Sequence, residues 1–142
     1  MSTEATRAAY QRFPHDTLTI PHDDRDRCRA AADTYRAAVQ VGVFMSLGAT
    51  DLTAIAGAHQ LGGLLITARI LPLRDGTRRE RPARMGVMIS HTPADEIDVH
   101  VLEYARGTDH THLNGIYIDQ LNRALLALDY DGTTPLNPHY WS

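Results

Sequence analysis

The sequence has 142 residues, 43% of them hydrophobic and 22% charged, a formal net charge of −3 and one cysteine. This length is typical of a single domain, and the composition excludes a disordered or fibrous chain. One cysteine cannot form an internal disulfide, and the most apolar stretch, residues 61–68, is too short to span a bilayer. We therefore expect a cytoplasmic protein with no membrane partner.

All 14 basic residues are arginines, because the sequence contains no lysine. This bias is typical of translated high-GC DNA and predicts an actinobacterial or phage source; a phage protein would be virion-associated. The charges are unevenly placed, since residues 61–90 carry six arginines and two acidic residues, whereas residues 91–142 carry two arginines and eight acidic residues. Such a dipolar pattern favours self-association or an anionic partner.

The first half of the chain predicts helices. A short helix over residues 3–12 should end at the Phe13-Pro14 step, because the residue before a proline avoids helical geometry. A longer helix is expected over residues 24–47, where apolar residues recur at steps of three and four and so share one face. The residues on that face are Cys28, Ala31, Tyr35, Ala38, Val39, Gly42 and Met45 or Ser46.

A third helix is predicted between Thr50, a capping residue, and the Gly62-Gly63 pair. It would contain Leu52, Ile55, Ala56 and His59. Residues 52–61 resemble the first helix and turn of a helix-turn-helix, with Gly57 at the turn. A DNA-binding protein is therefore one alternative.

Strands are predicted from residue 64 onward. Residues 64–73, 84–90 and 97–104 are rich in Ile, Val, Leu and Thr and are bounded by Pro, Gly and Asp, which predicts a three-stranded antiparallel meander. In the third strand Ile97, Val99, Val101 and Glu103 should face one way, and Asp98, His100, Leu102 and Tyr104 the other. One face of the predicted sheet should be buried.

A loop over residues 106–115 is expected to lead to a final helix, followed by a tail over residues 131–142. The buried face of that helix would consist of Ile118, Leu121, Leu125 and Leu128. The predicted fold class is α+β, with N-terminal helices, the meander, and a C-terminal helix packed on one face of the sheet. Within one domain over residues 1–142, residues 1–23 form an N-terminal helix and a Pro-rich connection, and residues 24–130 form the core.

Arginines are concentrated where the first two predicted strands must turn. Guanidinium groups pair with phosphate, and a basic β-hairpin can grip a nucleic-acid backbone as a wing does. A solvated turn, or a contact with an acidic protein surface, explains the same residues. The candidate anion-binding residues are Arg74, Arg78, Arg79, Arg81 and Arg84.

Eight histidines require metal binding to be considered. Three histidines and a carboxylate near the third strand could surround zinc and support a metal-dependent hydrolase. These candidates are His100, Asp109, His110 and His112, although their spacing matches no structural zinc pattern.

The sequence contains no catalytic or cofactor-binding motif. Cys28 lies on the apolar helix face and is interpreted as a core residue. Neither Ser46 nor the Ser90-His91 pair has an acidic partner at a recognisable spacing, and no glycine loop could hold a phosphate. We expect no cofactor and no catalytic residue.

The leading interpretation is a non-enzymatic interaction or assembly protein that self-associates. It depends on the charge asymmetry and on aromatic side chains near both ends of the chain, which a lone domain does not need there. These residues are Tyr10, Phe13, Tyr140 and Trp141. Nucleic-acid binding through the arginines and metal-dependent hydrolysis through the histidines are the alternatives.

Overall fold

The computed structural model describes residues 9, 13, 15–70, 73, 74, 77, 78, 83–104 and 108–128, with side chains for all of these except residues 15, 73, 74, 77, 78 and 108–112. The helical elements are α2 (His15–Leu18), η1 (His22–Asp24), α3 (Arg25–Ala38), α4 (Val41–Ser46), η2 (Ile118–Gln120) and α5 (Leu121–Leu128). The strands are β1 (Asp51–Ile55), β2 (Gly63–Ile70), β3 (Leu73–Arg74), β4 (Thr77–Arg78), β5 (Ala83–His91), β6 (Ile97–Glu103) and β7 (Thr108–Ile116).

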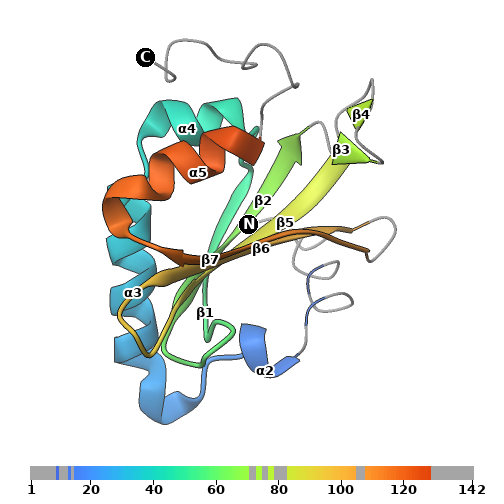
Figure 1. Cartoon of the computed structure of the whole chain (residues 1–142). Coiled ribbons are helices and arrows are strands. Elements are labelled where there is room, and N and C mark those ends of the chain that lie inside the picture. The colour runs from blue at the N-terminus through green and yellow to red at the C-terminus, as the bar shows by residue number, and fades with distance from the viewer. Residues whose placement is uncertain are drawn as a thin grey trace.

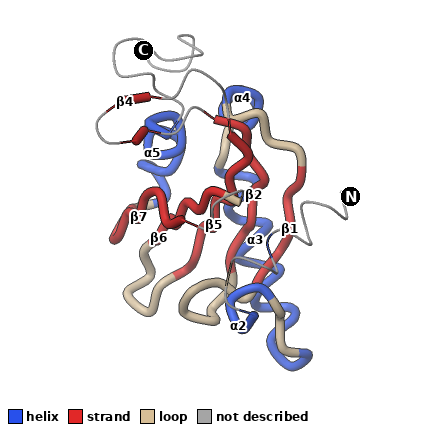
Figure 2. The backbone as a smooth tube through the Cα atoms, turned by 90° about the vertical axis from the view of Figure 1, so that its right-hand side faces the viewer, coloured by secondary structure: helices blue, strands red, loops and turns tan. Residues whose placement is uncertain are grey.

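The main sheet has five antiparallel strands in the order β1-β2-β5-β6-β7. The α+β class and the meander are therefore confirmed, but the predicted three strands are only the central β2, β5 and β6. The small β3–β4 hairpin is inserted between β2 and β5 and lies at the end of the sheet opposite α2 (Figures 1 and 2).

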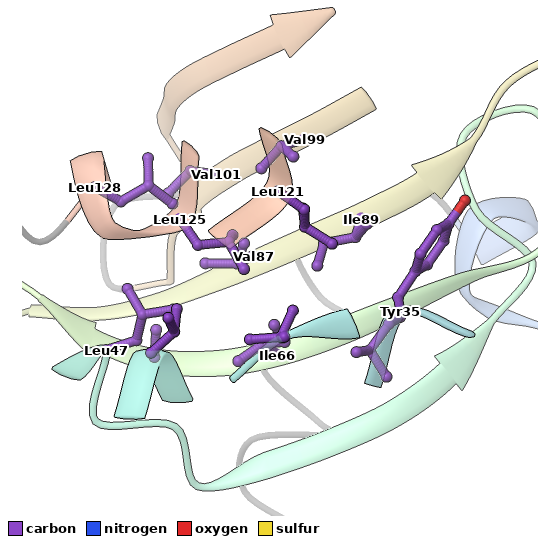
Figure 3. Packing of buried hydrophobic residues seen from close by; sticks show 14 of the residues in the cluster. Tyr35, Leu47, Ile66, Val87, Ile89, Val99, Val101, Leu121, Leu125 and Leu128 are labelled. Atoms are coloured by element: carbon purple, nitrogen blue, oxygen red, sulfur yellow. The ribbon is translucent and has the colours of Figure 1, made fainter. Parts of the chain in front are cut away.

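Helices α3, α4 and α5 all lie on one side of the sheet (Figure 1). Alternate side chains of β2, β5 and β6 point into this layer, as the two-residue period of a strand requires. Figure 3 shows Leu125 of α5 packed above Val87 of β5 and Leu121 beside Ile89 of the same strand. Leu47 and Ile66 belong to the same cluster. The predicted packing of the C-terminal helix on one face of the sheet is thus confirmed, whereas Leu18 of α2 packs on the other face.

The opposite face of the sheet carries a second, smaller apolar cluster. Phe13 and Leu18 from the N-terminal part of the chain pack there with Met88, Leu102 and Tyr104. Because Leu102 and Tyr104 belong to this cluster while Val99 and Val101 belong to the helix side, the alternation predicted for the third strand is confirmed.

The predicted helix over residues 24–47 is wrong as one element. Val39 and Gln40 have extended backbone angles and separate α3 from α4. The side chain of Asn122 stabilises this break, since its Nδ2 donates to Ala38 O at 2.9 Å and its Oδ1 accepts from Gln40 N at 2.8 Å. Beyond the break, Gly42 of the predicted face is buried but Met45 is exposed.

The predicted helix between Thr50 and Gly62 is also wrong, because residues 51–55 form β1. Leu52 pairs with Ile66 of β2, and the Thr50 N–H donates to Thr67 O at 3.0 Å. Residues 52–61 are therefore not the first helix and turn of a helix-turn-helix, and β2 stands where its recognition helix would be. A hairpin acting as the wing of such a motif is excluded with it.

The predicted loop over residues 106–115 is wrong from residue 108 onward, because β7 pairs with β6. Two register irregularities in this pair, between Ile97 and Val99 and between Val101 and Leu102, disturb the alternation that a sequence pattern requires. Ile118 was also placed wrongly on the buried helix face, since it lies in η2 and is 45% exposed. The N-terminal helix over residues 3–12 falls almost entirely outside the described residues, and the tail over residues 131–142 lies wholly outside them.

Candidate functional site

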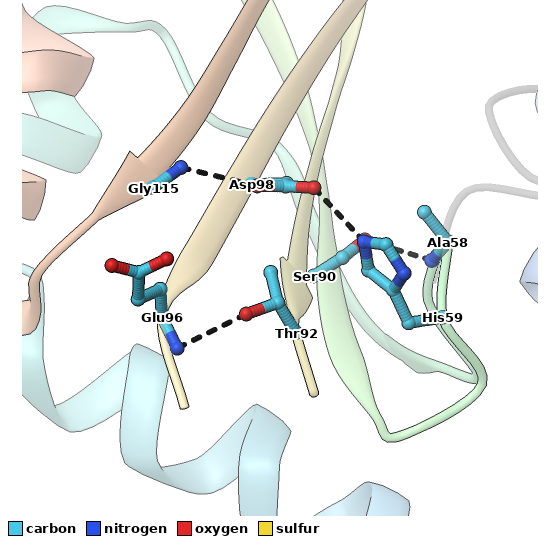
Figure 4. A network of polar contacts seen from close by, with 7 residues as sticks. All are labelled: Ala58, His59, Ser90, Thr92, Glu96, Asp98 and Gly115. Carbon is cyan, nitrogen blue, oxygen red and sulfur yellow. Dashed lines mark hydrogen bonds and ion pairs between the residues drawn. The ribbon is translucent and has the colours of Figure 1, made fainter. Parts of the chain in front are cut away.

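Polar side chains meet where the β1–β2 loop approaches the facing ends of β5 and β6 (Figure 4). His59 Nε2 lies 2.9 Å from Asp98 Oδ2, and the Gly115 N–H donates to Asp98 Oδ1 at 3.3 Å. The Ala58 N–H donates to Ser90 Oγ at 2.9 Å. These contacts attach the β1–β2 loop to the sheet at two neighbouring points.

This His–Asp pair does not form a nucleophilic triad with Ser90. Ser90 is completely buried, and its oxygen accepts the Ala58 N–H. A nucleophilic serine must reach substrate and hydrogen-bond to its base. The geometry of Ser90 is instead that of an anchor for the loop.

A second polar chain joins α3 to the end of β5. Tyr35 Oη lies 3.1 Å from His91 Nδ1, and His91 Nε2 lies 3.3 Å from Asp95 Oδ1. A carboxylate can only accept, so Nε2 carries a proton toward Asp95; in the neutral tautomer of the ring Nδ1 is then bare and accepts the Tyr35 O–H. Ser90-His91 therefore does have an acidic partner, which the turn between β5 and β6 brings back to the histidine.

Burial, and secondly the negative charge of Asp95, raises the pKa of Tyr35 to about 12. Tyr35 thus remains protonated and keeps its role as the donor to His91. Beside this chain, α3, Leu61 and the β5–β6 turn enclose a concavity of about 460 Å³. A polar chain that runs from the buried Tyr35 to an open concavity is a candidate ligand site.

Raising the pH from 10 to 12 is expected to lower the free energy of unfolding by about 2–3 kcal/mol through Tyr35. The unfolded tyrosine ionises near 10 while the folded one stays protonated to about 12, so this stability is present below pH 10 and is lost as pH rises. Urea denaturation followed by circular dichroism at several pH values measures the slope.

Tyr35→Phe should make that slope shallower without removing it, because burial also raises the pKa values of Tyr104 and Cys28. An identical slope in wild type and Tyr35→Phe would show that Tyr35 ionises equally in both states.

The predicted arginine site is only partly described. Arg74 and Arg78 lie in the β3–β4 hairpin, where Leu73 pairs with Arg78 and Arg74 with Thr77. Arg84 lies at the start of β5 and is exposed. Arg79 and Arg81 lie outside the described residues. The β3–β4 hairpin thus lies in the arginine-rich segment between the first two predicted strands. Anion binding by these arginines stays a prediction.

The predicted metal site is divided between two strands. His100 on β6 pairs in register with His112 on β7, and Asp109 pairs with Leu102. His110 belongs to β7, not to a loop. Among the residues whose side chains are described, no group of three His, Cys, Asp or Glu side chains could hold a metal ion. Since the side chains of residues 108–112 are outside that set, zinc binding stays a prediction.

Of the residues predicted to mediate self-association, only Phe13 is described. Its ring is buried within the chain, and a Cβ added at Gly86 would lie 2.7 Å from both Phe13 Cε2 and Tyr104 Oη. This packing accounts for Phe13 without a second copy. Tyr10, Tyr140 and Trp141 lie outside the described residues. Cys28 is fully buried, as a core residue should be.

The sequence analysis missed an apolar strip on the helix layer, formed by Val41 and Met45 of α4 with Tyr117 and Ile118 at η2. The first two are each 73% exposed, and the others 57% and 45%. Asn122 holds the start of α4 against α5, the helix that directly follows η2. The available signal was the absence of any charged residue from 39 to 50.

Comparisons with protein-family models, with curated proteins and with solved structures find no match to this chain. Across the part of the chain that the structure describes, every helix falls short of the length and apolarity needed to cross a membrane. The structure so far is that of a two-layer α+β protein, with a concavity of mixed apolar and polar lining at one end of its sheet and an apolar strip on its helices.

Proposed function

We propose that the protein is a non-enzymatic interaction or assembly protein that self-associates through the apolar strip. The observation that carries this proposal is the exposure of Val41 and Met45, each at 73%. Single apolar residues are common on protein surfaces, whereas neighbouring large ones are typical of contact surfaces. Burying them removes apolar surface from water, which is the main driving force of association.

The lack of charge supports a second copy of the chain as the partner. Residues 39–50 include α4 and carry no charged side chain, and interface cores are depleted of charge. In a two-fold dimer the same patch meets itself, so a charged patch would repel its own copy. An uncharged apolar strip faces no such repulsion.

Met45→Glu is expected to weaken self-association by about tenfold or more, because it places an unpaired carboxylate in an apolar contact. Met45 is exposed in the single chain, so the substitution should leave the fold unchanged. Light scattering over a range of concentrations measures the effect: wild type should approach twice the mass of one chain, and Met45→Glu should need about tenfold higher concentrations or more to reach the same mass.

Thr19→Glu is the matched control, since it adds the same charge at an exposed position between α2 and η1, away from the strip. It should associate as wild type does. A wild-type mass that stays at one chain at every concentration contradicts self-association. Equal association of Met45→Glu and wild type contradicts the choice of surface.

A further inference from the structure

The concavity of about 460 Å³ has apolar walls, formed by Ala30 and Ala31 of α3, by Leu61 of the β1–β2 loop and by Pro93 of the β5–β6 turn. Sites for small organic molecules have volumes of this order and combine apolar walls with a few polar groups. The chemical class of the ligand then follows from which hydrogen-bonding groups remain unused and from the local charge.

Three polar groups in the concavity have their hydroxyl or imidazole donors already engaged. Tyr35 donates its O–H to His91, and His91 donates its Nε2–H to Asp95. Thr34 Oγ1 donates to Ala30 O at 2.9 Å. What these groups still offer a ligand is acceptor capacity, on the oxygens of Tyr35, Thr34 and Asp95. A ligand that satisfies them must bring N–H or O–H donors.

The local charge favours a cation among such ligands. The positive charge of Arg27 is matched by Asp24, with Nη2 2.9 Å from Asp24 Oδ1, and the same nitrogen donates to Gln60 O at 3.2 Å. His91 is neutral when it accepts from Tyr35, so the negative charge of Asp95 has no matching positive charge among these groups. An anionic ligand would face this carboxylate, whereas an ammonium group would neutralise it.

We propose that this concavity binds a small organic ammonium ion, with its hydrocarbon part against Ala30, Ala31, Leu61 and Pro93 and its N–H groups toward Asp95 and Tyr35. This proposal does not depend on self-association, because the concavity lies between α3 and the β5–β6 turn and shares no residue with the apolar strip.

Three probes of matched shape test the ligand class: phenethylammonium, phenethyl alcohol and phenylacetate. Titrations are followed by amide nitrogen–proton correlation NMR on the full chain. Phenethylammonium should give saturable shift changes in residues 27–35 and 91–95, the alcohol should bind about fivefold more weakly, and phenylacetate should cause no change there. Equal affinity for all three, or no saturable change with phenethylammonium, overturns the proposal.

Two variants assign the contacts. Asp95→Asn should weaken phenethylammonium about two- to fivefold and leave the alcohol unchanged, because only the charge is removed; the Asp95 side chain is 91% exposed, so the fold is not at risk. Tyr35→Phe should weaken both probes about fivefold through the lost acceptor.

Asp119→Asn is the control, since it removes the charge of another exposed aspartate, in η2 and outside the concavity. If Asp119→Asn weakens phenethylammonium as much as Asp95→Asn does, the effect is one of overall charge and the proposed site is wrong. Shift changes confined to other parts of the chain also overturn it.

Discussion

Replacing Gly62 with alanine is expected to lower the free energy of unfolding by about 3 kcal/mol or more, because backbone strain and a steric clash add at this position. Gly62 has φ of +107°, a conformation that side chains rarely allow. A Cβ there would lie 2.7 Å from Ala31 Cβ and 2.9 Å from Cys28 Cα. The second atom belongs to the backbone of α3, so the helix itself must move.

Gly115→Ala separates the two contributions. Gly115 also has a positive φ, +66°, but the nearest atom to an added Cβ is Glu96 Oε1 at 3.5 Å, an ordinary contact. Only the left-handed conformation is penalised there, at a cost of about 1 kcal/mol. Urea denaturation followed by circular dichroism compares both variants with wild type. Equal losses would show that α3 does not approach Gly62 as closely as the distances indicate.

The Gly62-Gly63 pair was correctly predicted to separate two elements, since Gly62 ends the β1–β2 loop beside α3 and Gly63 begins β2. The error lies before it, where a helix was predicted in place of β1. The spacing of Leu52 and Ile55 fits one face of a helix, whereas in β1 the two side chains pack on opposite faces of the sheet. Residues 51–55 form a strand because they pair with β2, and the local sequence does not show that this partner is available.

The other misplaced elements also depend on distant contacts. β7 contains two histidines, an aspartate and an asparagine, and its irregular register removes the alternation by which β2, β5 and β6 were predicted. The break after α3 is stabilised by Asn122, more than eighty residues away in the sequence. Neither feature has a signal in the surrounding residues.

The candidate site was missed for a similar reason. Sequence reasoning grouped histidines that are close in the chain, namely His100, His110 and His112. The chain instead brings His59 to Asp98 and Tyr35 to His91, pairs that are 39 and 56 residues apart. Of these contacts, only that of His91 with Asp95 is local in the sequence. A spacing of four residues predicts a side-chain contact within a helix, but it predicts none within a strand followed by a turn.

Leu125→Ala is expected to lower the free energy of unfolding by about 2–5 kcal/mol, because it removes buried methyl groups and leaves a cavity between α5 and the sheet. Leu125 is completely buried in the core cluster, close to Val87 (Figure 3). α5 has only eight residues, which is too short to be stable without this packing. Chemical denaturation measures the loss.

Ile118→Ala provides the comparison, since sequence periodicity placed Ile118 and Leu125 on the same buried face. Ile118 is 45% exposed in η2, so its truncation should cost about 1 kcal/mol or less. A loss as large as that of Leu125→Ala would mean that η2 packs into the core in solution. The apolar strip would then lose Ile118, and self-association would depend on Val41, Met45 and Tyr117 alone.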